Sequence, residues 1–166
     1  MSFEFFVWDF AHMSDRKLRV LVADDHEQAR WALAYLLQPE CEVVGAVADG
    51  TQLIDAAISL RPDVIVSDVS MPSLSGPQAM NQLKRKGSNI PFVLVSADPS
   101  GKKEFLEQGA RAFVAKIDMG RELIAAVLTV ASGSRNAGSR FEDDLVGQDV
   151  ASISGSCEAS VAEVSS

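Results

Sequence analysis

The sequence predicts an α/β fold in which a doubly wound, five-stranded parallel sheet carries helices on both faces. From Leu18 onward, short runs rich in valine and isoleucine alternate with longer segments of helical period. This alternation is typical of successive βα units. Runs without alternating polar positions indicate strands that are covered on both faces, as the strands of parallel sheets are.

The elements follow one another along the chain, each strand preceding its helix. Strands are predicted at residues 19–23, 42–47, 64–67, 92–96 and 112–115. Helices are predicted at residues 27–37, 51–59, 77–86, 102–107 and 120–131. The first helix has the clearest i, i+4, i+7, i+8 apolar stripe. The members of this stripe are Ala29, Leu33, Leu36 and Leu37.

Length and composition favour one globular domain with tails, because 166 residues suffice for one ordinary core and 47% of them are hydrophobic. We expect the domain at residues 17–132 and a low-complexity, disordered tail at 133–166. Residues 1–16 form an N-terminal extension that is either non-native or disordered. Translation could begin naturally at Met13, or the aromatic residues 3–10 could bind a partner, and both interpretations stay open.

The charge of the chain excludes some classes of partner. A formal net charge of −8 argues against direct nucleic-acid binding, since that affinity comes largely from lysine and arginine. Residues 3–10 form neither a signal peptide nor a membrane span, because they lack a basic start and contain two acids. Cys41 and Cys157 match no disulfide or zinc motif. We therefore expect a cytoplasmic protein with no membrane partner.

Chemically active residues stand at the ends of four predicted strands. Asp24 and Asp25 follow the first strand, and Asp68 follows the third. Ser96 ends the fourth strand, and Lys116 follows the fifth. Ligands of open parallel sheets bind beyond the carboxyl ends of the strands, so these side chains should converge. Each one alone could be a helix cap, a turn residue or a solvated strand end, but their common placement favours a shared site.

Three converging carboxylates imply a bound cation, because they would otherwise repel one another. Mg2+ fits this set, since it takes oxygen ligands and is commonly held by one or two carboxylates together with a phosphate oxygen. One carboxylate then stays available to attack a phosphoryl group, while the metal and Lys116 stabilise the transferred charge. Asp68 is the central candidate for this nucleophile.

Four motifs make the chain resemble the receiver domains of two-component response regulators over residues 17–132. They are VLVADDH at residues 20–26, PDVIVSDVSMP at 62–72 with Gly76 following, VLVSA at 93–97, and GARAFVAK at 109–116. Within this family, the sequence most resembles the helix-turn-helix DNA-binding regulators. The resemblance implies a flavodoxin-like sheet with the strand order 2-1-3-4-5.

The resemblance also implies a metal site and a phosphorylation site. Asp25, Asp68 and the backbone carbonyl of Ser70 would ligate Mg2+, with Asp24 assisting. Asp68 would take the phosphoryl group from a histidine kinase or a phosphotransfer protein. Lys116 would contact that group.

A switch is implied at Ser96, which would contact the phosphoryl group, and at Phe113, which stands at the family's aromatic position. Plain core packing is the alternative for Phe113, which lacks the hydroxyl of the more frequent tyrosine. Phosphorylation would then bias a two-state packing of the last two helices. A phosphorylation-dependent homodimer through these helices stays open.

Two departures from the family pattern concern the signalling face. The segment from Ser96 to Lys116 is shorter than usual, and residues 98–101 (DPSG) replace part of the fourth helix. Glycine and proline disfavour a regular helix there, so we expect the helix at 102–107 to be short or mobile. Ile117 stands where the family often has proline or a small polar residue, which could change how Lys116 sits.

The expected activity is signalling, not catalysis. No output-domain pattern follows Ala131, so we expect a stand-alone receiver that contacts a downstream protein or passes the phosphoryl group on in a phosphorelay. A haloacid-dehalogenase-type phosphatase would need an acid two residues after its nucleophile, but His26 and Ser70 stand at the two relevant positions. A receiver-like module that is never phosphorylated is the other alternative. Ser70 and Asp98 are expected to set the lifetime of the phosphoryl group.

Overall fold

The computed structural model describes residues 16–134 of the chain. Contacts between residues divide the chain into two units, Met1–Ala131 and Ser132–Ser166, and the fold is that of the first unit. The predicted extension, with its alternative start at Met13, and the predicted tail lie outside the described residues, except for residue 16 and residues 133–134. None of the described helices is both long and apolar enough to cross a membrane.

The described strands form one parallel sheet. They are β1 (Leu18–Ala23), β2 (Cys41–Val47), β3 (Val64–Asp68), β4 (Phe92–Ser96) and β5 (Ala112–Ala115). Every neighbouring pair is parallel, and the spatial order is β2-β1-β3-β4-β5. This confirms the predicted doubly wound, flavodoxin-like sheet. The chain leaves β1 toward one edge and returns to the other side at β3, which makes the β1–β3 boundary a topological switch point.

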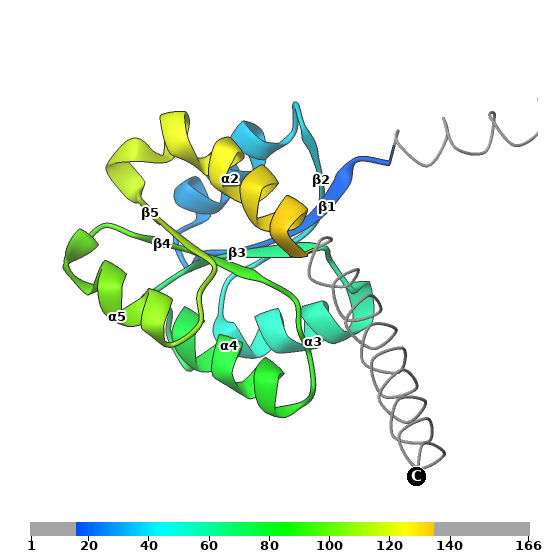
Figure 1. Ribbon diagram of the computed structural model, residues 1–166, viewed down its shortest axis with the longest axis vertical. Helices are drawn as coiled ribbons and strands as arrows, with labels where there is room; N and C mark the ends of the chain where they lie inside the picture. The colour runs from blue at the N-terminus through cyan, green and yellow to red at the C-terminus, as the bar shows by residue number, and fades with distance from the viewer. Residues whose placement is uncertain (1–15, 135–166) are drawn as a thin grey trace, which may run out of the picture. The chain divides into compact units, whose positions relative to one another are not determined.

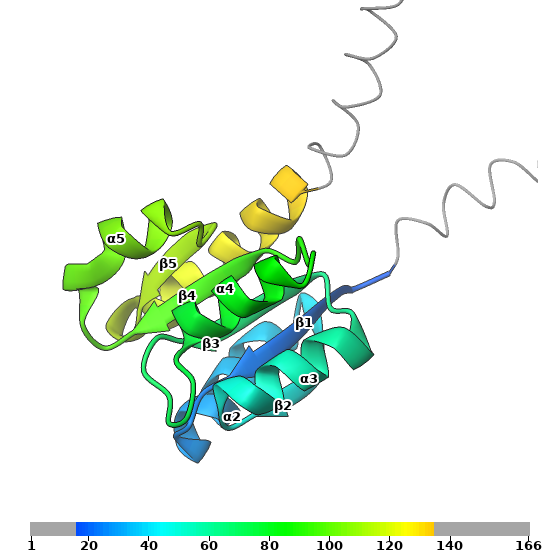
Figure 2. The same cartoon turned by 90° about the horizontal axis from the view of Figure 1, so that it is seen from below.

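Helices cover both faces of this sheet. They are α2 (Glu27–Leu37), α3 (Gly50–Leu60), α4 (Gly76–Arg85), α5 (Lys102–Glu107) and a last helix described at residues 119–134, with short 3-10 turns η1 (Pro99–Gly101) and η2 (Lys116–Asp118). Figure 1 shows α2 and the last helix above the sheet and α3, α4 and α5 below it. Figure 2 looks onto the face that carries α3, α4 and α5.

The inner strands β1, β3 and β4 are mainly apolar because both of their faces are buried. Val20 and Val22 of β1 belong to the core that includes Leu33 of α2, whereas Leu21 and Ala23 belong to the core on the opposite face. These four side chains of β1 are all 0% exposed. Successive strand residues point to opposite faces, so an unbroken apolar run fills two cores at once.

Two helix starts differ by one residue from the prediction because capping side chains precede them. α3 begins at Gly50, since the carboxylate of Asp49 accepts two backbone hydrogen bonds from its first turn. α4 begins at Gly76, where Ser75 and Gln78 form a capping box. Such caps satisfy the first amides of a helix and lengthen it toward its N-terminus.

Other boundaries shift for similarly local reasons. β1 begins at Leu18 and β2 at Cys41, since these two residues pair with each other across the sheet. β3 includes Asp68, which pairs with β4 and is not a loop residue. α4 ends at Arg85 and the last helix begins at residue 119, each one residue before its predicted limit.

The helix after β4 is short, as predicted. α5 has six residues and follows η1, whose first residue is Pro99. The carboxylate of Asp98 accepts a hydrogen bond from the Ser100 amide at 2.9 Å and so holds the turn before α5. The segment that replaces the start of a regular helix is therefore a defined 3-10 turn, because proline fixes its own φ and donates no backbone hydrogen bond.

Candidate functional site

Two aspartates lie at the switch point of the sheet. Asp24 follows β1 directly, and Asp68 is the last residue of β3, which pairs with β1. Both are buried, with 0% and 4% exposure. Parallel strands end at the same edge, so the topology brings these two carboxylates together although 44 positions separate them in the sequence.

Asp24 is held by donors on three sides. One carboxylate oxygen accepts a hydrogen bond from the backbone amide of His26 at 2.9 Å, and the other accepts one from Lys116 Nζ at 2.8 Å. Its backbone carbonyl accepts a hydrogen bond from Arg30 Nη1 at 2.7 Å. The loop after β1 is thus fixed by its own backbone, by α2 and by the residue after β5.

Lys116 neutralises both buried carboxylates. Its Nζ lies 2.8 Å from Asp24 Oδ2 and 3.3 Å from Asp68 Oδ2. Burial acts to lower the pKa of Lys116, but the hydrogen bond and charge of Asp24 and the charge of Asp68 outweigh it, so the pKa lies above its ordinary value. The ammonium is therefore charged at neutral pH and bridges the two acids.

One ammonium does not fully compensate the acids. Burial raises the pKa of Asp68 above its ordinary value, and the charges of Asp24 and Asp25 add to this rise against the opposing effect of Lys116. An acid with this pKa shift favours either a proton or a nearby cation. The electrostatics of the centre thus favour the binding of one more positive charge.

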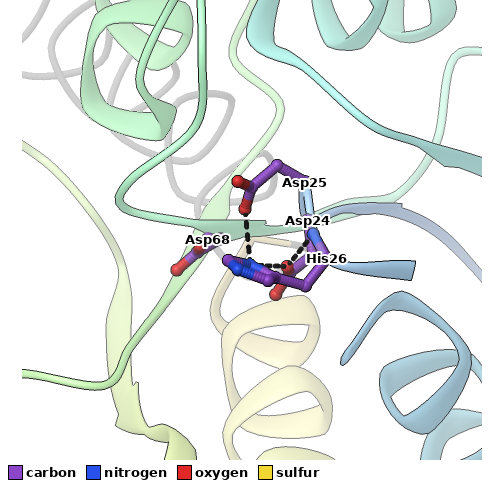
Figure 3. Close-up of side chains that lie close together, drawn as sticks. All are labelled: Asp24, Asp25, His26 and Asp68. Atoms are coloured by element: carbon purple, nitrogen blue, oxygen red, sulfur yellow. Dashed lines mark hydrogen bonds and ion pairs between the residues drawn. The ribbon is translucent and has the colours of Figure 1, made fainter. Parts of the chain in front are cut away.

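Asp25 supplies an oxygen suited to a cation. Its side chain is 28% exposed, yet its Oδ1 atom is buried and accepts no hydrogen bond from the described residues. Ligand atoms of Asp24, Asp25, His26 and Asp68 lie within 4.8 Å of one another (Figure 3). Oxygen donors, excess negative charge and an unsatisfied buried oxygen fit a hard divalent ion such as Mg2+.

Ser96 and Ser70 occupy different parts of the site. Ser96 is buried at the end of β4, and its Oγ accepts a hydrogen bond from the Asp98 amide at 3.1 Å. It pairs with Ala115 of β5, next to Lys116. Ser70 is exposed in the loop after β3 and lines an open groove that also includes Asp25. The structure thus brings both serines to the edge of the sheet that carries the aspartates.

Phe113 and Ile117 flank the site on the β5 side. Phe113 is buried in β5 and stacks on Phe105 of α5, with ring centroids 6.1 Å apart and planes inclined by 9°. Ile117 is 92% exposed, so it contributes nothing to the core. Although Ile117 departs from the family pattern, Lys116 Nζ still lies close to both Asp24 and Asp68.

The contacts of His26 and Arg30 at the acidic centre were not predicted from the sequence. His26 lies in the VLVADDH motif at residues 20–26, of which only Asp24 and Asp25 were predicted to be site residues. A signal for Arg30 was present, because it precedes Leu33 by three positions and Leu37 by seven on the inward stripe of α2. A charged residue on a buried stripe next to an acidic loop indicates a specific partner, here the Asp24 carbonyl.

The fold and the site together define a doubly wound α/β protein with an acidic, lysine-bridged centre at its switch point. Residues 20–128 match the family described as the response regulator receiver domain. The chain belongs to this family.

Two curated relatives illustrate the similarity in sequence. The transcriptional regulatory protein LiaR of Bacillus subtilis (strain 168) is 32% identical over 120 residues, which are 70% of this chain and 57% of LiaR. A protein-glutamate methylesterase/protein-glutamine glutaminase of Thermotoga maritima is 37% identical over 109 residues, which are 63% of this chain and 32% of that protein. The chain therefore matches about half or less of the length of these relatives.

Solved structures agree with this assignment. The signal receiver domain of the response regulator NarL from Mycobacterium tuberculosis has a TM-score of 0.67 and 31% identity, and the match covers 71% of this chain and 98% of that one. The response regulator domain of Thermotoga maritima CheB has a TM-score of 0.65 and 29% identity, with 70% and 98% of the two chains covered.

Proposed function

We propose that the chain accepts a phosphoryl group on Asp68 from a histidine kinase or a phosphotransfer protein. The observation that carries this proposal is the position of Asp68, whose Oδ2 lies 3.3 Å from Lys116 Nζ at the switch point of the sheet. A carboxylate oxygen of Asp68 attacks phosphorus, and the bond from phosphorus to the donor's imidazole nitrogen breaks. The imidazole leaves as the neutral donor after taking up a proton.

The charges of the site support this transfer. Receiver domains generally bind Mg2+ at an acidic pocket. Asp25, Asp68 and the backbone carbonyl of Ser70 would hold Mg2+ here, with Asp24 assisting. When bound, the ion supplies positive charge to the transferred phosphoryl oxygens. Lys116 supplies a second positive charge, and its hydrogen bond to Asp24 keeps the ammonium directed at the reacting edge.

Signal output is proposed to be phosphorylation-dependent contact with a downstream protein, without enzymatic turnover. Ser96 lies at the end of β4, where its hydroxyl could turn toward a phosphoryl group on Asp68. Phe113 stacks on Phe105 of α5, so a movement of Phe113 would also move that helix. Two-state repacking of this kind is how local charge changes act on a distant surface.

The first experiment is intact mass after incubation with acetyl phosphate and Mg2+. The native chain should gain one phosphoryl group, whereas Asp68→Asn or removal of Mg2+ should abolish the gain. Asp55→Asn is a suitable control, because Asp55 is exposed on α3, outside the acidic centre. A native chain that gains no mass under these conditions would instead support a receiver-like interaction module that is never phosphorylated.

The lifetime of the phosphoryl group is proposed to depend on Ser70 and Asp98. Ser70 is exposed in the loop after β3, and the hydrogen bonds from Ser100 lower the pKa of Asp98, which stays ionised and engaged at neutral pH. Replacing each by alanine and following the decay of the mass adduct tests this dependence. Unchanged decay rates in both variants would exclude them as determinants.

A further inference from the structure

His26 brings a nitrogen donor into the acidic centre. Its Nδ1 lies 2.9 Å from Asp25 Oδ1 and 3.6 Å from Asp24 Oδ1. Figure 3 shows both contacts running from the imidazole ring to the carboxylates. The four potential ligand atoms of this cluster, one of them nitrogen, lie within 4.8 Å of one another.

These separations match neighbouring ligands of one metal ion. Adjacent ligands of an octahedral ion with bonds of about 2.1 Å stand about 3.0 Å apart. The 2.9 Å between His26 Nδ1 and Asp25 Oδ1 equals this spacing within a tenth of an ångström. One ion could therefore contact both atoms without a large movement of either side chain.

The two atoms are close without forming a hydrogen bond. Asp25 Oδ1 is buried and accepts no hydrogen bond from the described residues, although the ring nitrogen is its near neighbour. Because no hydrogen bond from the described residues uses this oxygen, it is available to an ion placed between the two atoms.

The backbone at His26 is fixed while its ring is accessible. The amide of His26 donates to Asp24 Oδ1 at 2.9 Å, and the carbonyl of His26 accepts from the Arg30 amide at 2.9 Å. The side chain is 73% exposed, so an ion can reach the ring from solvent. The chain thus presents a nitrogen ligand from a constrained position at the rim of the site.

We propose that His26 is an inner ligand that lets this centre bind first-row transition-metal ions, such as Mn2+ and Co2+, more tightly than Mg2+. Imidazole suits transition metals, whereas Mg2+ is bound mainly through oxygen. This inference rests on the metal site of the proposed function and adds a nitrogen donor to its oxygen ligands.

The test uses Mn2+ bound to the whole chain. Pulsed electron paramagnetic resonance detects nitrogen coordinated to Mn2+, and calorimetry gives the affinities for Mn2+ and Mg2+. The test variant is His26→Phe, which keeps a ring but removes the nitrogen. His12→Phe is the matched control, because His12 and His26 are the two histidines of the chain.

The expected result is a nitrogen coupling in the native chain and in His12→Phe that is absent in His26→Phe. The affinity of His26→Phe for Mn2+ should fall at least about tenfold, because even the loss of a residue that only supports a metal ligand typically costs this much. Its affinity for Mg2+ should stay close to native.

Other results would overturn the proposal in distinguishable ways. Mn2+ bound by the native chain without nitrogen coupling would exclude His26 as a ligand and leave the oxygen site of the proposed function intact. Failure of Asp25→Asn to weaken either ion, or no binding of either ion to the native chain, would remove the metal site itself.

Discussion

Lys116 makes two buried acids compatible with a folded protein. Asp24 is 0% exposed, and Lys116 Nζ lies within 3.3 Å of both Asp24 and Asp68. Because removing one partner of a buried pair leaves the other charges uncompensated, a single substitution at this position should have a large effect. Lys116 is therefore expected to matter both for the stability of the fold and for the proposed phosphoryl transfer.

Lys116→Met should lower the free energy of unfolding by about 3 kcal/mol, the low end of the cost of breaking a buried ion pair. The low end applies because the lysine side chain is 22% exposed. Urea unfolding without metal measures the change. Lys103→Met is the control and should stay within about 0.5 kcal/mol, since Lys103 is 90% exposed and its 4.0 Å pair is at the surface. Equal effects of both substitutions would contradict the bridging role.

The raised pKa of Asp68 predicts how stability depends on pH in the absence of metal. Its ordinary pKa is 3.8, and burial with the neighbouring acids raises it in the folded chain. The folded state therefore binds more protons than the unfolded state, so this group makes stability rise as pH falls from neutral through the raised pKa. Asp68→Asn should remove that contribution and raise the melting temperature at neutral pH.

Melting curves of both proteins in EDTA between neutral pH and pH 4 test this prediction. The difference between the two proteins at each pH gives the part of the pH dependence that requires the Asp68 carboxyl. The idea fails if the difference in melting temperature is the same at every pH.

At the scale of elements, close backbone approaches position the site. Gly76 begins α4 directly beside the end of β3. A Cβ atom at this position would overlap the backbone carbonyl of Asp68 and lie 2.7 Å from Ser67 Oγ. Only glycine, which has no Cβ atom, lets α4 start so close to the strand that carries Asp68. Packing therefore explains why residue 76 is a glycine.

Gly76→Ala should therefore destabilise the fold by about 1–3 kcal/mol, the usual cost of forcing extra volume into a packed site. It should also slow the gain of phosphoryl mass, since the overlap falls on Asp68. Gly120→Ala is a matched control, because a Cβ there meets nothing within 4 Å. That substitution should be neutral or stabilising by up to about 1 kcal/mol in a helix. Urea unfolding of both variants provides the comparison, and equal stability of the two would refute the overlap.

Phe105 ties the short helix α5 to β5 through its stack on Phe113. Phe105→Ala should loosen α5, because six residues of helix have little stability without tertiary packing. Hydrogen exchange of the Gln108 and Ala110 amides, which donate to Glu104 and Phe105 carbonyls, should accelerate. Leu106→Ala removes a 37% exposed side chain and should accelerate exchange less. Equal exchange in the two variants would mean that the stack does not hold α5.

At the scale of the whole molecule, metal binding and folding should be coupled. The acids of the centre lie just after β1 and at the end of β3, so they meet only in the folded sheet, and an ion that binds them stabilises the folded state. At a Mg2+ concentration of 100 times the dissociation constant, the gain should be about 2.7 kcal/mol. Thermal unfolding with and without Mg2+ measures it. Asp25→Asn should lose most of the gain, whereas Asp55→Asn should keep it, and a gain retained in both would place the ion elsewhere.

Much of the fold could be predicted from local sequence signals. Valine-rich runs located the strands, because both faces of a parallel strand are buried. The predicted starts of α3 and α4 were each wrong by one residue, because the capping side chains of Asp49 and Ser75 decide them and lie outside the apolar pattern. The expectation of a stand-alone receiver stays a prediction, as do the roles of the individual site residues.

The sequence by itself determined the fold class, the family and the set of acids at the strand ends, because these follow from periodicity and from motifs within single segments. Tertiary structure decided which of these residues meet. Lys116 reaches Asp24 and Asp68 because the strands are parallel, so that β1, β3 and β5 all end at the same edge of the sheet. Distances of a few ångströms between side chains depend on packing, which no local pattern records.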